Sequence, residues 1–337
     1  MWSGPSLKDF AFKDLHELQR VNHFPGGFEL TRKDNMFEHL SEMARDFGDE
    51  IFDFIPETFV LPDQAQAFLE RYRTAGGIWI VKPSNAACGR GIFLFRNLAK
   101  SSLNVMESAV VSRYIHNPLL IQGLKFDLRI YVLVTQYEPL RAYIYREGLA
   151  RFASTSYSTD EAGLSDVYRH LTNYSINKHS PNFCENTEVG QDNHGHKWSL
   201  SAFNRHVKWV GGDPKLVWHR IMDLCVKTLL AVEPLIANRT RKTVDNPGVC
   251  FELYGFDVLV DDCLKPWILE VNLSPSMMAE SPLDWQIKSS LLSDAFNLVG
   301  VSNPDLRTVR AAKVRNQVAQ ARAAHRKMLL ERGSFTG

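Results

Sequence analysis

The segment GFDVLVDDCLKPWILEVN, residues 255–272, constrains the fold more than any other part of the sequence. Two apolar runs flank the turn-like DDCLKP, a pattern typical of two antiparallel strands. We set the register by placing Asp261 opposite Pro266, which brings Asp257 opposite Glu270, with Asn272 two residues further along the same face. The same register pairs Val260 with Trp267 and Val258 with Leu269. The other face is then wholly apolar and needs a core to cover it: Phe256, Val258, Val260, Trp267, Leu269 and Val271.

The polar face of this strand pair predicts a magnesium site. Two carboxylates directly opposite each other repel unless a cation lies between them. The oxygens of Asp257, Glu270 and Asn272 suit Mg²⁺, which takes its remaining ligands from water and substrate phosphates. Zinc is disfavoured because no His or Cys joins the group. The alternative is a solvated face whose carboxylates are ordinary surface charges.

The composition is that of a globular protein without a disulfide framework. The 337 residues suffice for about two domains. The 39 Lys and Arg against 38 Asp and Glu give a net charge of +1, which excludes a polycation that coats nucleic acid. The five cysteines contain no CxxC pair, and no secretion signal or membrane-spanning apolar run is present. We therefore expect a soluble, intracellular and monomeric protein that binds neither nucleic acid nor membranes.

Strand-like and helix-like segments alternate along the chain. Apolar spacing predicts helices over 34–47 and 63–73, one long helix over 214–238, another over 284–298 and a strongly basic one over 305–333. Runs rich in Val, Ile, Tyr and Phe predict strands, whereas residues 150–215 read as polar loops. This pattern favours an α+β enzyme core of at least two packed units. The predicted strands besides the pair above are 78–83, 91–95, 109–115, 127–136 and 140–148.

Two further segments carry weaker signals of a nucleotide site. Lys82 ends a predicted strand before a loop that contains Gly89 and Gly91, and backbone amides of such a loop approach phosphates closely. Neither a Walker motif nor GxGxxG occurs, so an ordinary hairpin is the alternative. In KFDLRIYVLV, Lys125, Asp127 and Arg129 share one face of an apolar strand, as in the wall of a cleft or a solvated sheet edge.

Taken together, ordered motifs give the chain a clear resemblance. WIVKP, SRYIHNPLLIQGLKFDLRIYVLVT, PLRAYIYREGLARFA, HLTNYSINK, GHKWSLSA, CFELYGFDVLV and LKPWILEVNLSPS occur in this order, preceded by NHFPGGFELTRKD at 22–34. They resemble the tubulin tyrosine ligase-like family of the ATP-grasp superfamily, in particular its polyglutamylase branch, over residues 1–303. The resemblance implies an N-terminal domain over 1–62 that is partial, a central domain over 63–120, a catalytic domain over 121–303 and a basic helical tail over 304–337.

The resemblance also implies a role for each matching residue. Asp257, Glu270 and Asn272 match magnesium ligands, and Lys82 and Arg129 are the residues expected to act catalytically on the phosphates. Lys33 matches a residue that also reaches the nucleotide. The residues that match ATP contacts are Lys82, Arg90, Gly91, Ser112, Arg113, Tyr114, Ile115, Lys125, Asp127, Thr172 and Asn173. Those that match contacts to the incoming amino acid are Arg151, Tyr174, Lys197 and Lys288.

The activity implied is ATP-dependent, Mg²⁺-dependent ligation of glutamate to glutamate side chains in the acidic C-terminal tails of tubulin, through an acyl phosphate. Arg151, Lys197 and Lys288 supply enough cations for the two carboxylates of glutamate, whereas glycine needs one. Three alternatives stay open: a glycine ligase, a ligase acting on an acidic protein other than tubulin, and a silent microtubule-binding relative. The basic tail would suit an acidic filament surface, and the expected location is the cytoplasm and the microtubule cytoskeleton, including cilia or basal bodies.

Overall fold

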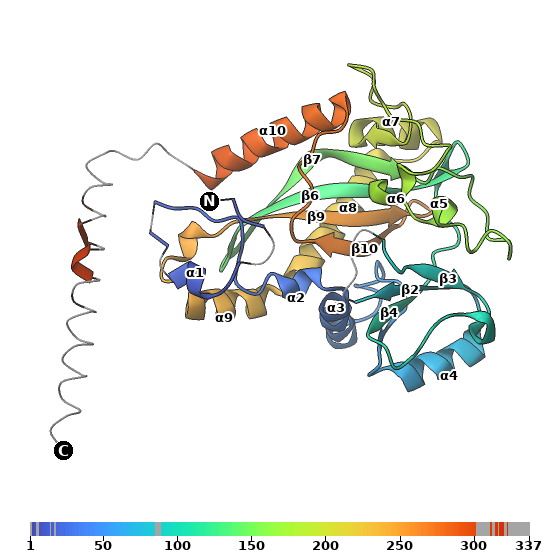
Figure 1. Cartoon of the computed structure of the whole chain (residues 1–337), viewed down its shortest axis with the longest axis horizontal. Helices are drawn as coiled ribbons and strands as arrows, with labels where there is room; N and C mark the ends of the chain where they lie inside the picture. The colour runs from blue at the N-terminus through green and yellow to red at the C-terminus, as the bar shows by residue number, and fades with distance from the viewer. Residues whose placement is uncertain are drawn as a thin grey trace.

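The computed structural model describes residues 2–4, 7–13, 15–16, 18–84 and 89–300, together with a few residues between Ala311 and Arg322. Two antiparallel sheets form its frame (Figure 1). The larger sheet has the order β10-β9-β6-β7-β8, and the short β5 pairs with β6. Its strands are β5 Leu120–Ile121, β6 Leu124–Tyr137, β7 Leu140–Phe152, β8 Lys197–Ser199, β9 Glu252–Val260 and β10 Pro266–Asn272.

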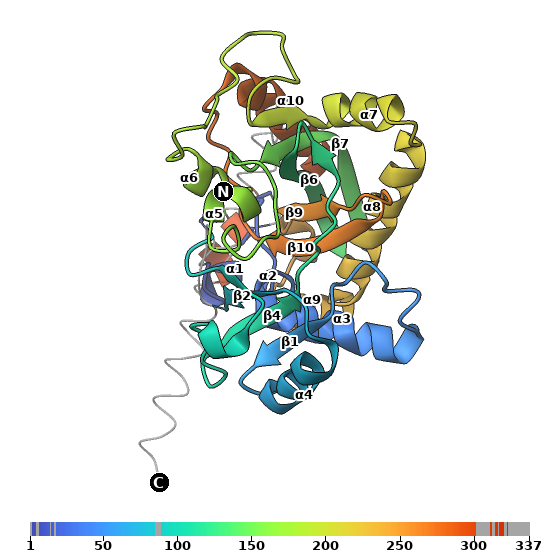
Figure 2. The same cartoon turned by 90° about the vertical axis from the view of Figure 1, so that its right-hand side faces the viewer.

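The smaller sheet has the order β1-β4-β2-β3 and carries one helix, α4 Ala65–Ala75. Phe68 of α4 packs on the buried Trp79, with their rings 5.3 Å apart and nearly perpendicular. Figure 2 shows α4 on the side of this sheet that faces away from the larger one. The strands are β1 Thr58–Leu61, β2 Trp79–Pro83, β3 Phe93–Phe95 and β4 Ala109–Arg113.

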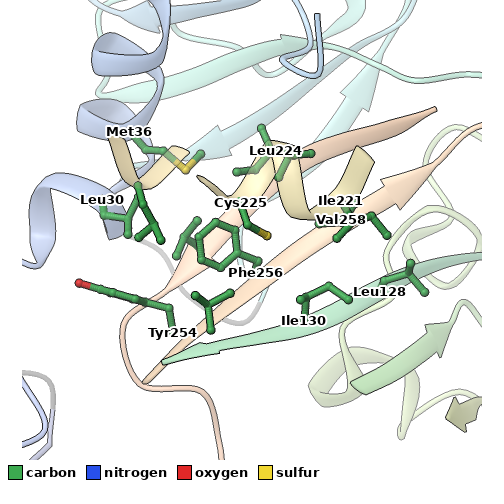
Figure 3. Packing of buried hydrophobic residues seen from close by; sticks show 14 of the residues in the cluster. Leu30, Met36, Leu128, Ile130, Ile221, Leu224, Cys225, Tyr254, Phe256 and Val258 are labelled. Atoms are coloured by element: carbon green, nitrogen blue, oxygen red, sulfur yellow. The ribbon is translucent and has the colours of Figure 1, made fainter. Parts of the chain in front are cut away.

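Helices cover both faces of the larger sheet. The helices α8 Pro214–Leu230 and α9 Glu233–Thr243 cover one face, where Figure 3 shows Leu224 and Cys225 of α8 against Phe256 and its neighbours on the sheet. The helix α10 Pro282–Val299 packs on the other face against Tyr131 and Leu133 of β6. Because side chains alternate along β6, those of one face lie in the core with α8 and α9. Tyr131 and Leu133, on the other face, lie in a separate core with α10. The other helices are α1 Phe10–Lys13, α2 Phe28–Thr31, α3 Lys33–Phe47, α5 Val167–His170, α6 Tyr174–Asn177 and α7 Leu200–Trp209, with 3₁₀ turns at Leu98–Lys100 and Pro247–Val249.

These elements confirm the α+β class and correct several of our predictions. The segment 214–238, predicted as one helix, forms two. The helical conformation is interrupted at Ala231 and Val232, and the second helix has Pro234 in its first turn. The segment 150–215 contains α7, whose Ser199 side chain accepts a hydrogen bond from Ala202 N as an N-cap. Most of the basic helix over 305–333 lies outside the described residues. Across the part of the chain that the structure describes, no helix combines the length and apolarity needed to cross a bilayer.

The predicted register of β9 and β10 is wrong at one end and right at the other. Val260 pairs with Pro266 and Val258 with Ile268, one residue away from the predicted partners, whereas Asp257 pairs with Glu270 as predicted. A bulge at Leu269 absorbs the difference. Consequently Ile268, and not its neighbours Trp267 and Leu269, lies in the core with Phe256, Val258, Val260 and Val271.

The bulge makes a testable distinction between two adjacent apolar residues. We expect Ile268→Ala to lower the free energy of unfolding by about 2–5 kcal/mol, because Ile268 is fully buried in the larger core. Leu269→Ala should cost about 1 kcal/mol or less, because Leu269 is half-buried at the wall of a cleft. Chemical denaturation of the two variants checks this, and the opposite ranking would show that the strands pair without the bulge.

Candidate active site

A cleft that is partly open to solvent lies where the smaller sheet faces β6, β9 and β10. One wall comes from β2 and β4 with the residues that follow them, and the other comes from the larger sheet. Most of the predicted nucleotide and metal residues line this cleft, although they come from segments far apart in sequence: Lys33, Lys82, Arg90, Ser112, Arg113, Tyr114, Ile115, Lys125, Asp127, Thr172, Asn173, Asp257 and Glu270.

Strand register brings the charged residues of the larger sheet into two adjacent rows. Arg129 of β6 pairs with Asp257 of β9, which in turn pairs with Glu270 of β10. In the next row Asp127 of β6 pairs with Arg151 of β7, which pairs with Lys197 of β8. Cross-strand partners on one face have neighbouring Cβ atoms. Therefore the predicted metal ligands, phosphate cation and amino-acid cations form one continuous polar surface.

Asp257 is the most heavily contacted carboxylate of this surface. Arg129 Nε donates to Oδ1 at 2.6 Å, Arg151 Nη2 lies 2.8 Å from Oδ2, and Asn272 Nδ2 donates to Oδ2 at 3.3 Å. Burial alone would raise the pKa of Asp257, but the two guanidinium groups outweigh it and hold the pKa below its usual range. Asp257 is therefore ionised at neutral pH. Asn272 lies beside it as predicted, although Asn272 does not line the cleft itself.

Arg151 occupies a different environment from the one we predicted. It was expected to bind the amino acid, but its guanidinium forms a bidentate pair with Asp127, with Nε 2.8 Å from Oδ1, and also contacts Asp257. Arg151 is buried, so these two carboxylates supply the acceptors that a buried guanidinium requires. The three residues come from three different strands, so spacing within one strand could not show this pairing.

Two lysines bring positive charge to the metal-ligand end of the cleft. Lys82 Nζ donates to the carbonyl of Leu269 at 3.1 Å, so the bulge that corrects the register also supplies a partner for this lysine. Burial lowers the pKa of Lys82 to about 8, although Glu270 pulls in the other direction. Lys33, at the start of α3, lies 3.2 Å from Glu270 Oε2. The N-terminal segment thus reaches the site.

A buried carboxylate holds that N-terminal segment against β9. Glu252 is fully buried and accepts hydrogen bonds from Phe24 N at 3.1 Å and Tyr254 Oη at 2.9 Å, and its Oε1 lies 2.7 Å from His23 Nδ1. Gly27 packs so closely here that a Cβ would lie 3.0 Å from Glu252 Oε2. These contacts fix the turn into α2 and α3, which carries Lys33.

At the other end of the cleft, Lys125 is enclosed by aromatic and carbonyl groups. Its Nζ donates to Tyr114 Oη at 3.0 Å and to the carbonyl of His170 at 2.9 Å. Burial lowers the pKa of Lys125 to about 7, although Asp127 pulls in the other direction. The guanidinium of Arg113 lies over the ring of Trp79, 5.1 Å from its centroid. Both residues belong to the smaller sheet, so this charge is held there.

The glycine loop lies against the polar loop that contains Thr172 and Asn173. Gly89 has a φ of +78°, and a Cβ there would lie 3.1 Å from Asn173 Oδ1 and 2.5 Å from Ile176 Cδ1. Gly91 has a φ of +71° and approaches the ring of Pro83. Both positions therefore require glycine, which agrees with a loop whose backbone lies close to its neighbours. Gly91 itself does not line the cleft.

The remaining predicted amino-acid contacts form a second cluster next to the cleft. Lys197 Nζ lies 4.3 Å from the ring centroid of Tyr174 and 2.6 Å from Asp284 Oδ2. Lys288 Nζ lies 3.4 Å from Asp284 Oδ1 and donates to the carbonyl of Met278. Sequence reasoning missed Asp284, a fully buried carboxylate in the first turn of α10. Its spacing of four residues from Lys288 was the available signal.

Comparison with known proteins gives a consistent result. The model of the tubulin-tyrosine ligase family matches residues 12–308. The tubulin polyglutamylase TTLL5 of Mus musculus is 46% identical over 302 residues, which are 89% of this chain and 22% of the relative. The tubulin polyglutamylase ttll-5 of Caenorhabditis elegans is 44% identical over 89% of this chain and 43% of its own length.

The tubulin monoglutamylase TTLL4 of Mus musculus is 41% identical over 307 residues, which are 91% of this chain and 26% of that protein. The chain thus spans less than half of the length of these relatives. Together with the ordered motifs and the cleft that they line, the family match establishes that the chain belongs to the tubulin-tyrosine ligase family.

Proposed function

We propose that this chain is an ATP-dependent ligase that joins glutamate, through an isopeptide bond, to glutamate side chains in the C-terminal tails of tubulin. The observation that carries the proposal is the pair of adjacent charged rows whose carboxylates, Asp127, Asp257 and Glu270, line one cleft. The names of the relatives support tubulin as the acceptor and glutamate as the added residue. The cytoplasmic microtubules are accordingly the proposed place of action.

The metal-ligand residues fit Mg²⁺ by their chemistry. Asp257 and Glu270 present carboxylate oxygens from paired positions on neighbouring strands. Asn272, whose amide nitrogen donates to Asp257 Oδ2, also has a carboxamide oxygen to offer. An all-oxygen set without His or Cys suits a hard cation. When bound, Mg²⁺ would neutralise charge on the phosphates of ATP. Two lysines lie beside these residues: Lys33 pairs with Glu270, and Lys82 donates to the carbonyl of Leu269.

The proposed reaction has two steps. A carboxylate oxygen of the acceptor glutamate attacks the γ-phosphorus of ATP, the bond to the β-phosphate oxygen breaks, and ADP leaves as the acyl phosphate forms. The amine of the free amino acid then attacks the acyl carbon, loses a proton and expels phosphate, which leaves an amide. Lys82 and Arg129 are the cations proposed to stabilise the charge that develops in these steps.

The amino-acid pocket is proposed to lie at Tyr174, Lys197 and Lys288. Lys197 and Lys288 share one carboxylate, Asp284, so this cluster has a surplus of one positive charge. One surplus charge suits one carboxylate of the substrate. Arg151 is balanced by Asp127 and Asp257, so charge alone does not separate glutamate from glycine. Glutamate is proposed as the substrate because the relatives are named glutamylases.

We expect Glu270→Gln to abolish ligation, by at least about 100-fold, because the variant loses a negative oxygen ligand and the partner of Lys33. The measurement is mass spectrometry of stabilised microtubules after incubation with the protein, Mg-ATP and an equimolar mixture of glutamate and glycine. Glu161→Gln is the matched control, because Glu161 is exposed and pairs only weakly with Lys100 at 3.5 Å. Addition of glutamate by both variants would contradict the role of Glu270, and addition of glycine would contradict the proposed specificity.

We expect Lys288→Ala to raise KM for glutamate by about tenfold while the affinity for ATP stays within about twofold. The variant removes one ammonium group from the amino-acid cluster and leaves the ATP cleft intact, since Lys288 does not line that cleft. Steady-state kinetics at varied glutamate, together with a direct ATP titration, separates the two effects. An equal loss in both measurements would place Lys288 at the nucleotide instead.

A further inference from the structure

His170 is a buried histidine that the proposed reaction does not use. Only 1% of its surface is exposed, and it lies at the end of α5 in the wall of the cleft. Its two ring nitrogens have different partners: Nε2 lies 3.0 Å from the carbonyl of Gly163, and Nδ1 lies 2.9 Å from Tyr114 Oη. Tyr114 Oη in turn accepts a hydrogen bond from Lys125. One continuous chain of hydrogen bonds therefore joins Gly163 to Lys125.

This chain has a fixed direction. The carbonyl of Gly163 can only accept, so Nε2 of His170 must carry a hydrogen. Burial and the nearby Lys125 lower the pKa of His170 to about 4, which leaves Nδ1 without a proton at neutral pH. Nδ1 therefore accepts from the Tyr114 hydroxyl, and the hydroxyl hydrogen points away from Lys125. The oxygen of Tyr114 is left with lone pairs directed at the lysine.

Lys125 receives a defined orientation from these contacts. In its protonated form Lys125 has three N–H donors, and Tyr114 Oη and the carbonyl of His170 accept two of them. The third is left for a group in the cleft, at the end away from Glu270, beside Tyr114 and Ile115. Tyr157 packs on the same histidine, with ring centroids 5.8 Å apart, and its own hydroxyl donates to the carbonyl of His116.

We propose that His170 is a positioning residue of the nucleotide site, which acts through the Tyr114 hydroxyl to keep Lys125 as a donor directed at the base end of the bound nucleotide. The inference rests on the proposed function, because it takes the ligand of this cleft to be ATP. Without the acceptor at Nδ1, the Tyr114 hydroxyl turns its hydrogen to another partner, such as the hydroxyl of Tyr157. Its lone pairs then turn away from Lys125, and the lysine loses its orientation.

The test is direct titration of the protein with ATP and, separately, with adenosine, which keeps the base end and lacks the phosphates. His170→Phe keeps a ring but removes the acceptor, and should weaken both ligands by about tenfold. Tyr114→Phe removes the same link and should have a similar effect. His170→Asn is the rescue variant, because Asn Oδ1 can replace Nδ1 as acceptor, and should stay within about twofold of the wild type.

The double variant decides whether His170 acts through Tyr114. In the Tyr114→Phe background, His170→Phe should cause no further loss of affinity, because the link is already broken. Additive losses, a loss for ATP without one for adenosine, or unchanged affinities in Tyr114→Phe would each overturn the inference. If His170→Phe does not fold, the Tyr114→Phe and His170→Asn titrations still decide it. Absence of ATP binding by the wild type would instead overturn the proposed function itself.

Discussion

The pairing of β9 with β6 on one side and β10 on the other is the constraint on which the rest of the structure depends. The pairing places Arg129, Asp257 and Glu270 side by side in one row. On the opposite face the same three strands present Ile130, Phe256 and Val271 to the helices α8 and α9. A slip of one residue would exchange the two faces. Burial of the apolar face therefore also fixes the position of the charges.

One face of β6 is charged over the first half of the strand and apolar over the second half. Lys125 and Asp127 line the cleft and Arg129 pairs with Asp257, whereas Tyr131 and Leu133, further along the same face, pack under α10. The charged half is stabilised by opposite charges from neighbouring strands, since burial of unpaired charges would be costly. The apolar half anchors α10, which carries the carboxylate of Asp284 next to Lys197. One strand thus connects the cleft proposed to bind the nucleotide with the cluster proposed to bind the amino acid.

The candidate site is assembled from segments that have no sequence proximity. Lys33 reaches Glu270 across more than 200 positions because Glu252 holds the preceding turn against β9. Lys82 reaches the carbonyl of Leu269 from the smaller sheet. His170 reaches Lys125 through the hydroxyl of Tyr114. Each of these contacts joins a loop or strand end to the larger sheet, so the cleft exists only when both sheets are in place.

The sequence by itself determined the family and which side chains of residues 255–272 share the polar face. Alternation along residues 255–272 separated Asp257 and Glu270 from the apolar face, and the ordered motifs indicated the family, because these signals are local and depend on spacing within single strands. The tertiary structure decided what spacing does not encode. The bulge at Leu269, the engagement of Arg151 by two carboxylates and the link from His170 to Lys125 all arise between segments that meet only in the folded chain. Their energies depend on burial and on partners from distant segments, which no local pattern records.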